Sequence, residues 1–112
     1  MRSNFDINNF RCIKHIRDVS YFGIRFKCSY NQMVGMLGLP HSIEDDKEHN
    51  SWFVLNNNDV ACTIYDFKTR GNPSNHPDQD EHWHIGSATE KDCELLAEEL
   101  ETELTAKRLN IS

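Results

Sequence analysis

The sequence predicts an α+β fold. We expect a two-layer sandwich in which an antiparallel sheet of about four strands carries a short N-terminal helix and a long C-terminal helix on one face. Three observations predict it: a strand pattern that runs into a helix-capping sequence, a hairpin pattern in mid-chain, and apolar residues at helical spacing near the end. A chain of 112 residues suits one domain, so we expect residues 1–112 to form a single unit.

The composition is typical of a folded protein in water. Hydrophobic residues make up 38% of the chain and charged residues 27%, a balance that disordered chains do not show. No apolar run approaches the roughly 20 residues that span a bilayer, and the start lacks the pattern of an export signal. We therefore expect a cytoplasmic protein without membrane contact. Its four cysteines would stay reduced, as core or half-buried residues.

The net charge of −6 is unevenly distributed along the chain. Residues 1–28 carry a net charge of +4, whereas residues 29–112 carry −10. An acidic total argues against duplex nucleic acid as a partner, because neutralising phosphates requires a net basic face. The basic beginning of the chain remains able to hold a small anion.

The first regular element is a strand. Residues 1–18 begin with an Asn-rich stretch and are expected to be loosely ordered. Residues 20–28 alternate between apolar and polar side chains, which predicts a strand. The alternation would place Phe22, Ile24 and Phe26 together on one face.

A short helix follows at once. Ser29 and Gln32 have the spacing of a capping box, in which each side chain satisfies a free backbone N–H at the start of a helix. Gly38 is placed to end the helix, and Pro40 cannot continue it. The expected apolar stripe consists of Tyr30, Met33, Val34 and Leu37.

The middle of the chain predicts a β-hairpin. Residues 51–56 and 60–67 are strand-like, and the Asn- and Asp-rich residues 56–59 between them favour a turn. Both strands are apolar on both sides, which indicates a central position in the sheet. The polar stretches 41–50 and 68–81 read as loops, and the second is long enough to suggest a functional role.

The last two elements are a strand and a helix. Residues 82–87, "HWHIGS", predict a short strand, with the two histidines on one face and Trp83 on the other. A helix follows from Thr89 to about Leu109, because Cys93, Leu96, Ala97, Leu100 and Leu104 recur at helical spacing. Seven acids lie between Glu90 and Glu103.

Aromatic residues in successive strands suggest a ligand site. Trp52, Tyr65 and Trp83 fall in neighbouring strands about 4.8 Å apart, so their rings are able to form a ladder that stacks a planar group. Cationic side chains near the strand ends would clamp an anion. The alternative is that the ladder is core and faces the helices. The candidate ligand-binding residues are Trp52, Tyr65, Lys68, Arg70, Trp83, His84 and Arg25.

A metal site is a weaker candidate. His82 and His84 point the same way on a strand, and two imidazoles on one face are able to bind zinc if a third ligand completes the site. That ligand would come from His76, Asp78, Asp80 or Glu81, but the spacing selects none of them. No motif of nucleophilic catalysis or phosphate binding occurs in the chain. We therefore expect no catalytic residues and no cofactor.

Four stretches carry a resemblance to a known family. They are "LGLP" (37–40), "SWFV" (51–54), "CTIYDFK" (62–68) and "HWHIGS" (82–87). In this order they resemble a family of small, uncharacterised bacteriophage accessory proteins. Its members carry G-x-P, a Trp-bearing strand, "TIYDWK" or "TIYNWK", and "WHIGG". The resemblance covers roughly residues 20–105, most of the chain.

The resemblance is not complete. Phe67 stands where the family has Trp, and Ser87 stands where it has a second Gly. It implies an intracellular protein made during infection of a bacterium and acting on a host system, but it implies no catalytic residues. The positions that match the signature are Tyr65, Asp66, Lys68, Trp83, His84 and Gly86.

Three functional hypotheses follow, in order of preference. The first is a non-enzymatic antagonist of host defence that sequesters a nucleotide-like signal molecule on the aromatic ladder. The second is an acidic inhibitor that binds a host protein through the helix at 89–109. The third is a metal-dependent hydrolase that uses His82 and His84. The small size of the chain also favours a homodimer or a larger homo-oligomer.

Overall fold

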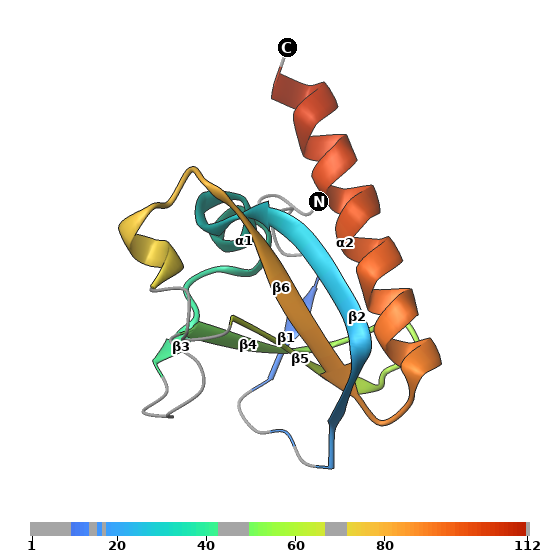
Figure 1. The fold of residues 1–112 in the computed structure, drawn as a ribbon. Coiled ribbons are helices and arrows are strands. Elements are labelled where there is room, and N and C mark those ends of the chain that lie inside the picture. Colours follow the sequence, from blue (N-terminus) through green and yellow to red (C-terminus); the bar gives the residue numbers. More distant parts are fainter. Residues whose placement is uncertain (1–9, 14–15, 17, 43–49, 67–71, 112) are drawn as a thin grey trace.

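The structure, a computed structural model, describes residues 10–13, 16, 18–42, 50–66 and 72–111. It has an antiparallel sheet covered by two helices, which confirms the α+β class (Figure 1). The main path of the sheet has the order β1-β4-β5-β6-β2, and β3 pairs with β4. The elements are β1 (Arg11–Cys12), β2 (Ser20–Ser29), α1 (Tyr30–Leu37), β3 (His41–Ser42), β4 (Asn50–Leu55), β5 (Ala61–Tyr65), a 3-10 turn (Pro73–Asn75), β6 (Asp80–Ser87) and α2 (Glu90–Ile111).

The sheet is wider than predicted, and the short helix follows β2, in the predicted order. The four long strands were all expected, but β1 and β3 have only two residues each. Strands this short lack a readable alternation of side chains. They form because β4 offers backbone groups that pair with them, at Leu55 and Val54 for β1 and at Ser51 and Asn50 for β3.

Strand β2 departs from regular alternation. Its pairing with β6 shifts register between Tyr21 and Arg25, and Gly23 within that interval has φ +89°. A positive φ is accessible to glycine at low cost, so the residue permits a bulge. Of the three residues predicted to share a face, Phe26 is buried and Ile24 packs against the core, whereas Phe22 is 40% exposed.

Helix α1 begins and ends as predicted. The Ser29 hydroxyl accepts a hydrogen bond from the Gln32 backbone N–H at 3.1 Å, and the Gln32 side chain accepts one from the Ser29 N–H at 2.9 Å. This is the reciprocal capping box. Gly38 ends the helix with φ +86°, and its N–H donates to the Val34 carbonyl at 2.8 Å. The helix buries Met33, Met36 and Leu37.

The β4–β5 turn is built around Asn56, which is 1% exposed. Its Oδ1 accepts from the backbone N–H groups of Asn58 at 2.9 Å and Val60 at 3.1 Å. Its Nδ2 donates to the Asp92 carbonyl at 3.2 Å, so the turn is tied to the start of α2. Asp59 takes the left-handed conformation expected of this stretch, with φ +65°.

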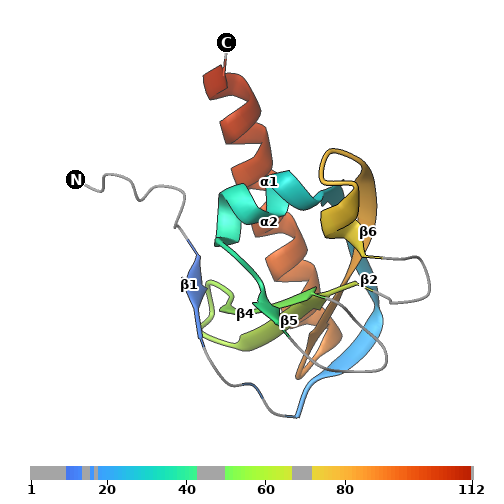
Figure 2. The ribbon, with the colours of Figure 1, turned by 90° about the vertical axis from the view of Figure 1, so that its left-hand side faces the viewer.

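The core lies between the sheet and the two helices, which Figure 2 shows on the same side of the sheet. Helix α2 contributes Cys93, Leu96, Leu100 and Leu104, all buried, and Ala97 packs against them, as the helical spacing predicted. The strands contribute Phe26, Cys28, Trp52, Val54, Cys62, Ile64, Trp83 and Ile85. None of the described helices is both long enough and apolar enough to cross a membrane.

The second predicted loop, 68–81, is structured where the structure describes it. Residues 68–71 lie outside the described residues. Asn72 caps the 3-10 turn by accepting from the Ser74 N–H at 3.0 Å, and it also accepts from the Asn50 side chain at 2.9 Å. Strand β6 then begins at Asp80, two residues before the predicted strand. The bond from Asn50 therefore ties this β5–β6 connection to the start of β4.

Candidate functional site

The predicted aromatic ladder does not form, because its members lie on opposite faces of the sheet. Trp52 pairs with Ile64 across the β4–β5 ladder, which places Tyr65 on the other face from Trp52. Trp52 is 2% exposed and Trp83 is 0% exposed. Their rings meet edge to face, with centroids 5.3 Å apart. Both tryptophans therefore belong to the core, and neither presents a ring face to a ligand.

The indole N–H groups support this placement. Trp83 Nε1 donates to the Cys28 carbonyl at 2.9 Å, and Trp52 Nε1 donates to the Gly38 carbonyl at 2.9 Å. Buried tryptophans normally satisfy their N–H in this way. These bonds connect β6 to the end of β2, and β4 to the end of α1.

The outer face of the sheet carries a different aromatic cluster, formed by Tyr21, Tyr65 and His84. The Tyr21 ring stacks on the His84 imidazole with centroids 4.5 Å apart and an interplanar angle of 9°. Tyr65 meets the same imidazole edge-on at 5.4 Å. Sequence reasoning missed Tyr21, because the β2 bulge decides where its ring lies. Arg25 lies next to this cluster, paired with His84 across the β2–β6 ladder.

His84 is a neutral imidazole in these surroundings. Burial lowers its pKa, the charge of Arg25 and the neighbouring His82 lower it further, and Asp66 acts in the opposite direction. The ring is 7% exposed. His84 therefore contributes a flat, uncharged surface under Tyr21 at neutral pH.

The other predicted site residues do not converge on one place. Lys68 and Arg70 lie outside the described residues. His82 is exposed, whereas His84 is buried under Tyr21. Within the described part of the chain, no group of three His, Cys, Asp or Glu side chains is placed to hold a metal ion. The proposed hydrolase site thus has no third ligand there.

Burial makes the thiols of Cys62 and Cys93 poor nucleophiles. Cys28, Cys62 and Cys93 are buried, as predicted, whereas Cys12 is exposed. Burial raises the pKa of Cys93 to about 11 and also raises the pKa of Cys62. A thiol with a raised pKa stays protonated at neutral pH and is a poor nucleophile.

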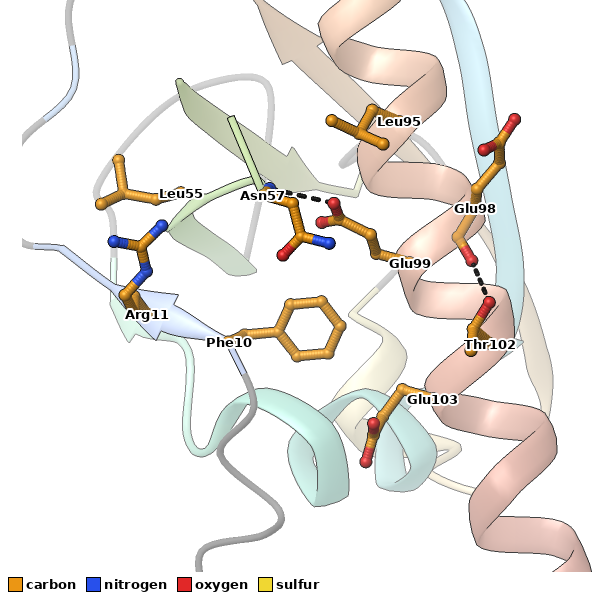
Figure 3. A pocket seen from close by; sticks show the side chains of 9 residues that line it. All are labelled: Phe10, Arg11, Leu55, Asn57, Leu95, Glu98, Glu99, Thr102 and Glu103. Carbon is orange, nitrogen blue, oxygen red and sulfur yellow. Dashed lines mark hydrogen bonds between the residues drawn. The ribbon is translucent and has the colours of Figure 1, made fainter. Parts of the chain in front are cut away.

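A groove of about 380 Å³ lies between α2 and the strands β1 and β4 (Figure 3). Its apolar lining comes from Phe10, Leu55 and Leu95, all half-buried. Acids on α2 line the same groove, namely Glu98, Glu99 and Glu103. Sequence reasoning did not identify this groove, because its lining residues are far apart in the chain.

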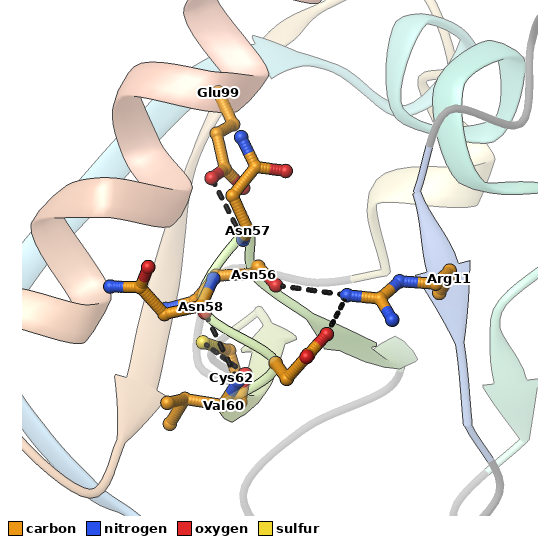
Figure 4. A network of polar contacts seen from close by, with 8 residues as sticks. Arg11, Asn56, Asn57, Asn58, Val60, Cys62 and Glu99 are labelled. Atoms are coloured by element: carbon orange, nitrogen blue, oxygen red, sulfur yellow. Dashed lines mark hydrogen bonds and ion pairs between the residues drawn. The ribbon is translucent and has the colours of Figure 1, made fainter.

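The charge inside the groove is negative. Glu99 accepts a hydrogen bond from the Asn57 N–H at 2.9 Å. Burial nevertheless raises the pKa of Glu99, against the lowering effects of that bond and of Arg11. Among the described residues, Arg11 is the one base in the lining (Figure 4), and its guanidinium is ion-paired with Asp59. The described lining therefore carries more acids than bases.

A second hollow, of about 470 Å³, lies beside the first turns of α2. Leu95 and Glu98 line both hollows. The two hollows therefore adjoin one another along α2. We call the exposed acids at one-turn spacing along it, Glu94, Glu98 and Glu101, the acidic ridge.

No protein-family model matches the chain, and a search of curated proteins finds no match. The resemblance to phage accessory proteins therefore stays a prediction. Two surfaces are the candidate sites: the aromatic cluster on the outer face of the sheet, and the acidic ridge of α2 with its hollows.

Proposed function

We propose that this protein is a non-enzymatic binding protein that captures a positively charged surface of another protein. The observation that carries the proposal is the acidic ridge. Seven acids occur between Glu90 and Glu103, and Lys91 is the one base in that interval. A concentrated charge of one sign speeds encounter with a partner of the opposite sign and selects against partners of the same sign.

The sign of the charge is the reason for preferring a protein target to a nucleotide-like ligand. Both hollows on the α2 side are lined mainly by acids among their charged groups, and carboxylates repel phosphate. The two tryptophans that motivated base stacking are in the core. The resemblance to phage proteins supports a target in the cytoplasm of an infected bacterium, where capture would inhibit a host defence protein or a nucleic-acid-handling protein.

Charge reversal of the ridge tests the proposal. In the triple variant Glu94→Lys, Glu98→Lys and Glu101→Lys we expect capture of host proteins from bacterial lysate to fall at least about tenfold, a change of roughly 1.4 kcal/mol. We also expect the captured proteins to elute from the unmodified chain as salt is raised. The measurement is quantitative mass spectrometry of proteins retained on the immobilised chain. All three side chains are exposed, so the fold should survive.

A matched control separates local from general charge. Asp80→Lys changes an exposed acid at the start of β6, away from α2. It should reduce capture far less than Glu98→Lys, which changes the net charge by the same amount. An unchanged set of captured proteins after the triple reversal would contradict the proposal.

A second candidate function is favoured by the outer-face cluster. Tyr21 is 40% exposed and lies flat on His84 beside Arg25. A planar ring with a negative charge, such as a nucleotide-derived signal, would stack on Tyr21 and pair with the guanidinium. In this form the sequestration hypothesis no longer requires the tryptophans.

Thermal-shift measurements with cyclic nucleotides and ADP-ribose derivatives test this second function. We expect a stabilising shift that Tyr21→Ala and Arg25→Ala each remove and that the exposed neighbour control Lys27→Ala keeps. Native mass spectrometry of the protein purified from infected cells should then show the bound molecule, and the same spectra report whether the chain is a homodimer. A protein without a ligand and without any shift would exclude this function.

A further inference from the structure

We infer that the groove between Phe10 and α2 receives a bulky apolar side chain from a basic helical segment of the partner protein. The inference rests on the proposed function, because it specifies how that partner docks. It adds where the partner docks, namely in this groove, and which residues the docking segment carries. That segment has an apolar anchor with Lys or Arg one helical turn away on each side.

The apolar part of the inference comes from the groove lining. Phe10, Leu55 and Leu95 come from β1 and its flank, from β4 and from α2, and each remains half-buried. Figure 3 shows the Phe10 ring on one side of the groove and α2 on the other. A volume of about 380 Å³ lies at the lower end of the range of about 300–1,000 Å³ for ligand pockets. Filling such a pocket with an aromatic or aliphatic anchor is how many protein interfaces obtain most of their affinity.

The basic part comes from the acids around the same groove. Glu99 and Glu103 are four residues apart on α2, so they lie on one face of the helix, one turn apart. On a partner helix, cations one turn before and one turn after the anchor lie two turns apart, so they would flank this one-turn pair of acids, one cation toward each end. Glu99 is partly buried, and its burial raises its pKa because water stabilises the charged carboxylate less there. A cation beside Glu99 would stabilise that charge in place of water.

Charge favours a basic helical segment in this groove over a nucleic acid, an anionic membrane or a second copy of the chain. A nucleic acid or an anionic membrane surface would bring negative charge to a negative groove. A second copy of this chain has a net charge of −6 and would bring its own acids along. A basic amphipathic segment of another protein is therefore the occupant that the groove fits best.

Two synthetic helical peptides of equal length and equal positive charge test the inference. One has a central Trp flanked by lysines one helical turn away on each side, and the other has Ser in place of Trp. We expect the Trp peptide to bind at least about tenfold more tightly in fluorescence anisotropy titrations. Equal affinities of the two peptides would overturn the inference.

Variants of the groove locate the effect. Thr102→Trp fills the groove from an exposed position and should abolish the preference for the Trp peptide while leaving the Ser peptide unaffected. Leu95→Asp should also abolish the preference for the Trp peptide. The control is Thr105→Asp, which adds the same charge at an exposed position outside the groove lining and should keep the preference. Circular dichroism checks that each variant is folded. A preference that survives both groove variants would place the anchor elsewhere and overturn the inference.

The design also separates this inference from the proposed function. If neither peptide binds in a salt-dependent manner, both fail. If the Ser peptide binds as tightly as the Trp peptide and the triple Lys variant loses both, the proposed function stands and the groove inference fails. Sedimentation equilibrium covers the remaining occupant: self-association that Thr102→Trp abolishes would show that a second copy fills the groove, and would overturn the inference.

Discussion

Replacing Trp83 by Ala is expected to lower the free energy of unfolding by about 3–5 kcal/mol. The side chain is fully buried, its ring packs edge to face against Trp52, and its N–H satisfies the Cys28 carbonyl. Truncation would leave a large cavity at the centre of the core and a buried carbonyl without its donor. Because a domain of this size has a total stability of about 5–15 kcal/mol, much of the population should unfold.

Urea denaturation followed by far-ultraviolet circular dichroism measures the effect. Trp83→Phe separates the two contributions, because it keeps an aromatic ring but removes the N–H. We expect it to cost about 1–3 kcal/mol, between the unmodified protein and Trp83→Ala. The control is His82→Ala, an exposed position next in the chain, which should change stability by less than about 0.5 kcal/mol. A loss below about 1 kcal/mol for Trp83→Ala would contradict the placement of this ring in the core.

Replacing Asn56 by Ala is expected to lower the free energy of unfolding by about 2–3 kcal/mol. The side chain is 1% exposed and bonds two backbone N–H groups of its own turn and the Asp92 carbonyl at the start of α2. Alanine fills little of the vacated space and removes all three hydrogen bonds in a partly buried site. The β4–β5 turn and the first turn of α2 should then loosen together.

Thermal and urea unfolding measure the loss, and amide hydrogen exchange should show that protection falls at Asn58 and Val60. The control is Asn58→Ala in the same turn. Its side chain is exposed, and its backbone N–H keeps the bond to Asn56 Oδ1. Equal losses for the two variants would mean that turn propensity, rather than the hydrogen bonds of Asn56, explains the effect.

Much of the fold was predictable because its causes are local. The capping box of Ser29 and Gln32, the stop at Gly38 and the turn at residues 56–59 each depend on a few neighbouring residues, and the structure has all three. The apolar spacing of α2 has the same character, since one face of a helix can be read from a short window of sequence. The widened sheet was missed because the pairing of two-residue strands depends on a distant partner.

The candidate sites were less predictable for two reasons. Strands β4 and β5 carry apolar residues on both faces, so neither strand shows from its sequence which face is buried. The register between them, which pairs Trp52 with Ile64, is what places Trp52 and Tyr65 on opposite faces. Alternation already puts Tyr21 on the same face as Arg25, but only the register shift near Gly23 brings it opposite Gly86 and onto His84. The groove combines residues 10, 55 and 95 from three separate elements.

The sequence by itself determined where the helices and long strands lie, which face of α2 is buried, and that the chain carries an acidic helix. These properties follow from the periodicity and capping of short segments, whose physical causes lie within one or two turns of chain. The tertiary structure alone decided that Trp52 and Trp83 are core, that Tyr21 covers His84, and that a groove lined by apolar and acidic residues runs beside the acidic ridge. Those outcomes depend on register and on contacts between residues far apart in the chain, which no local pattern specifies.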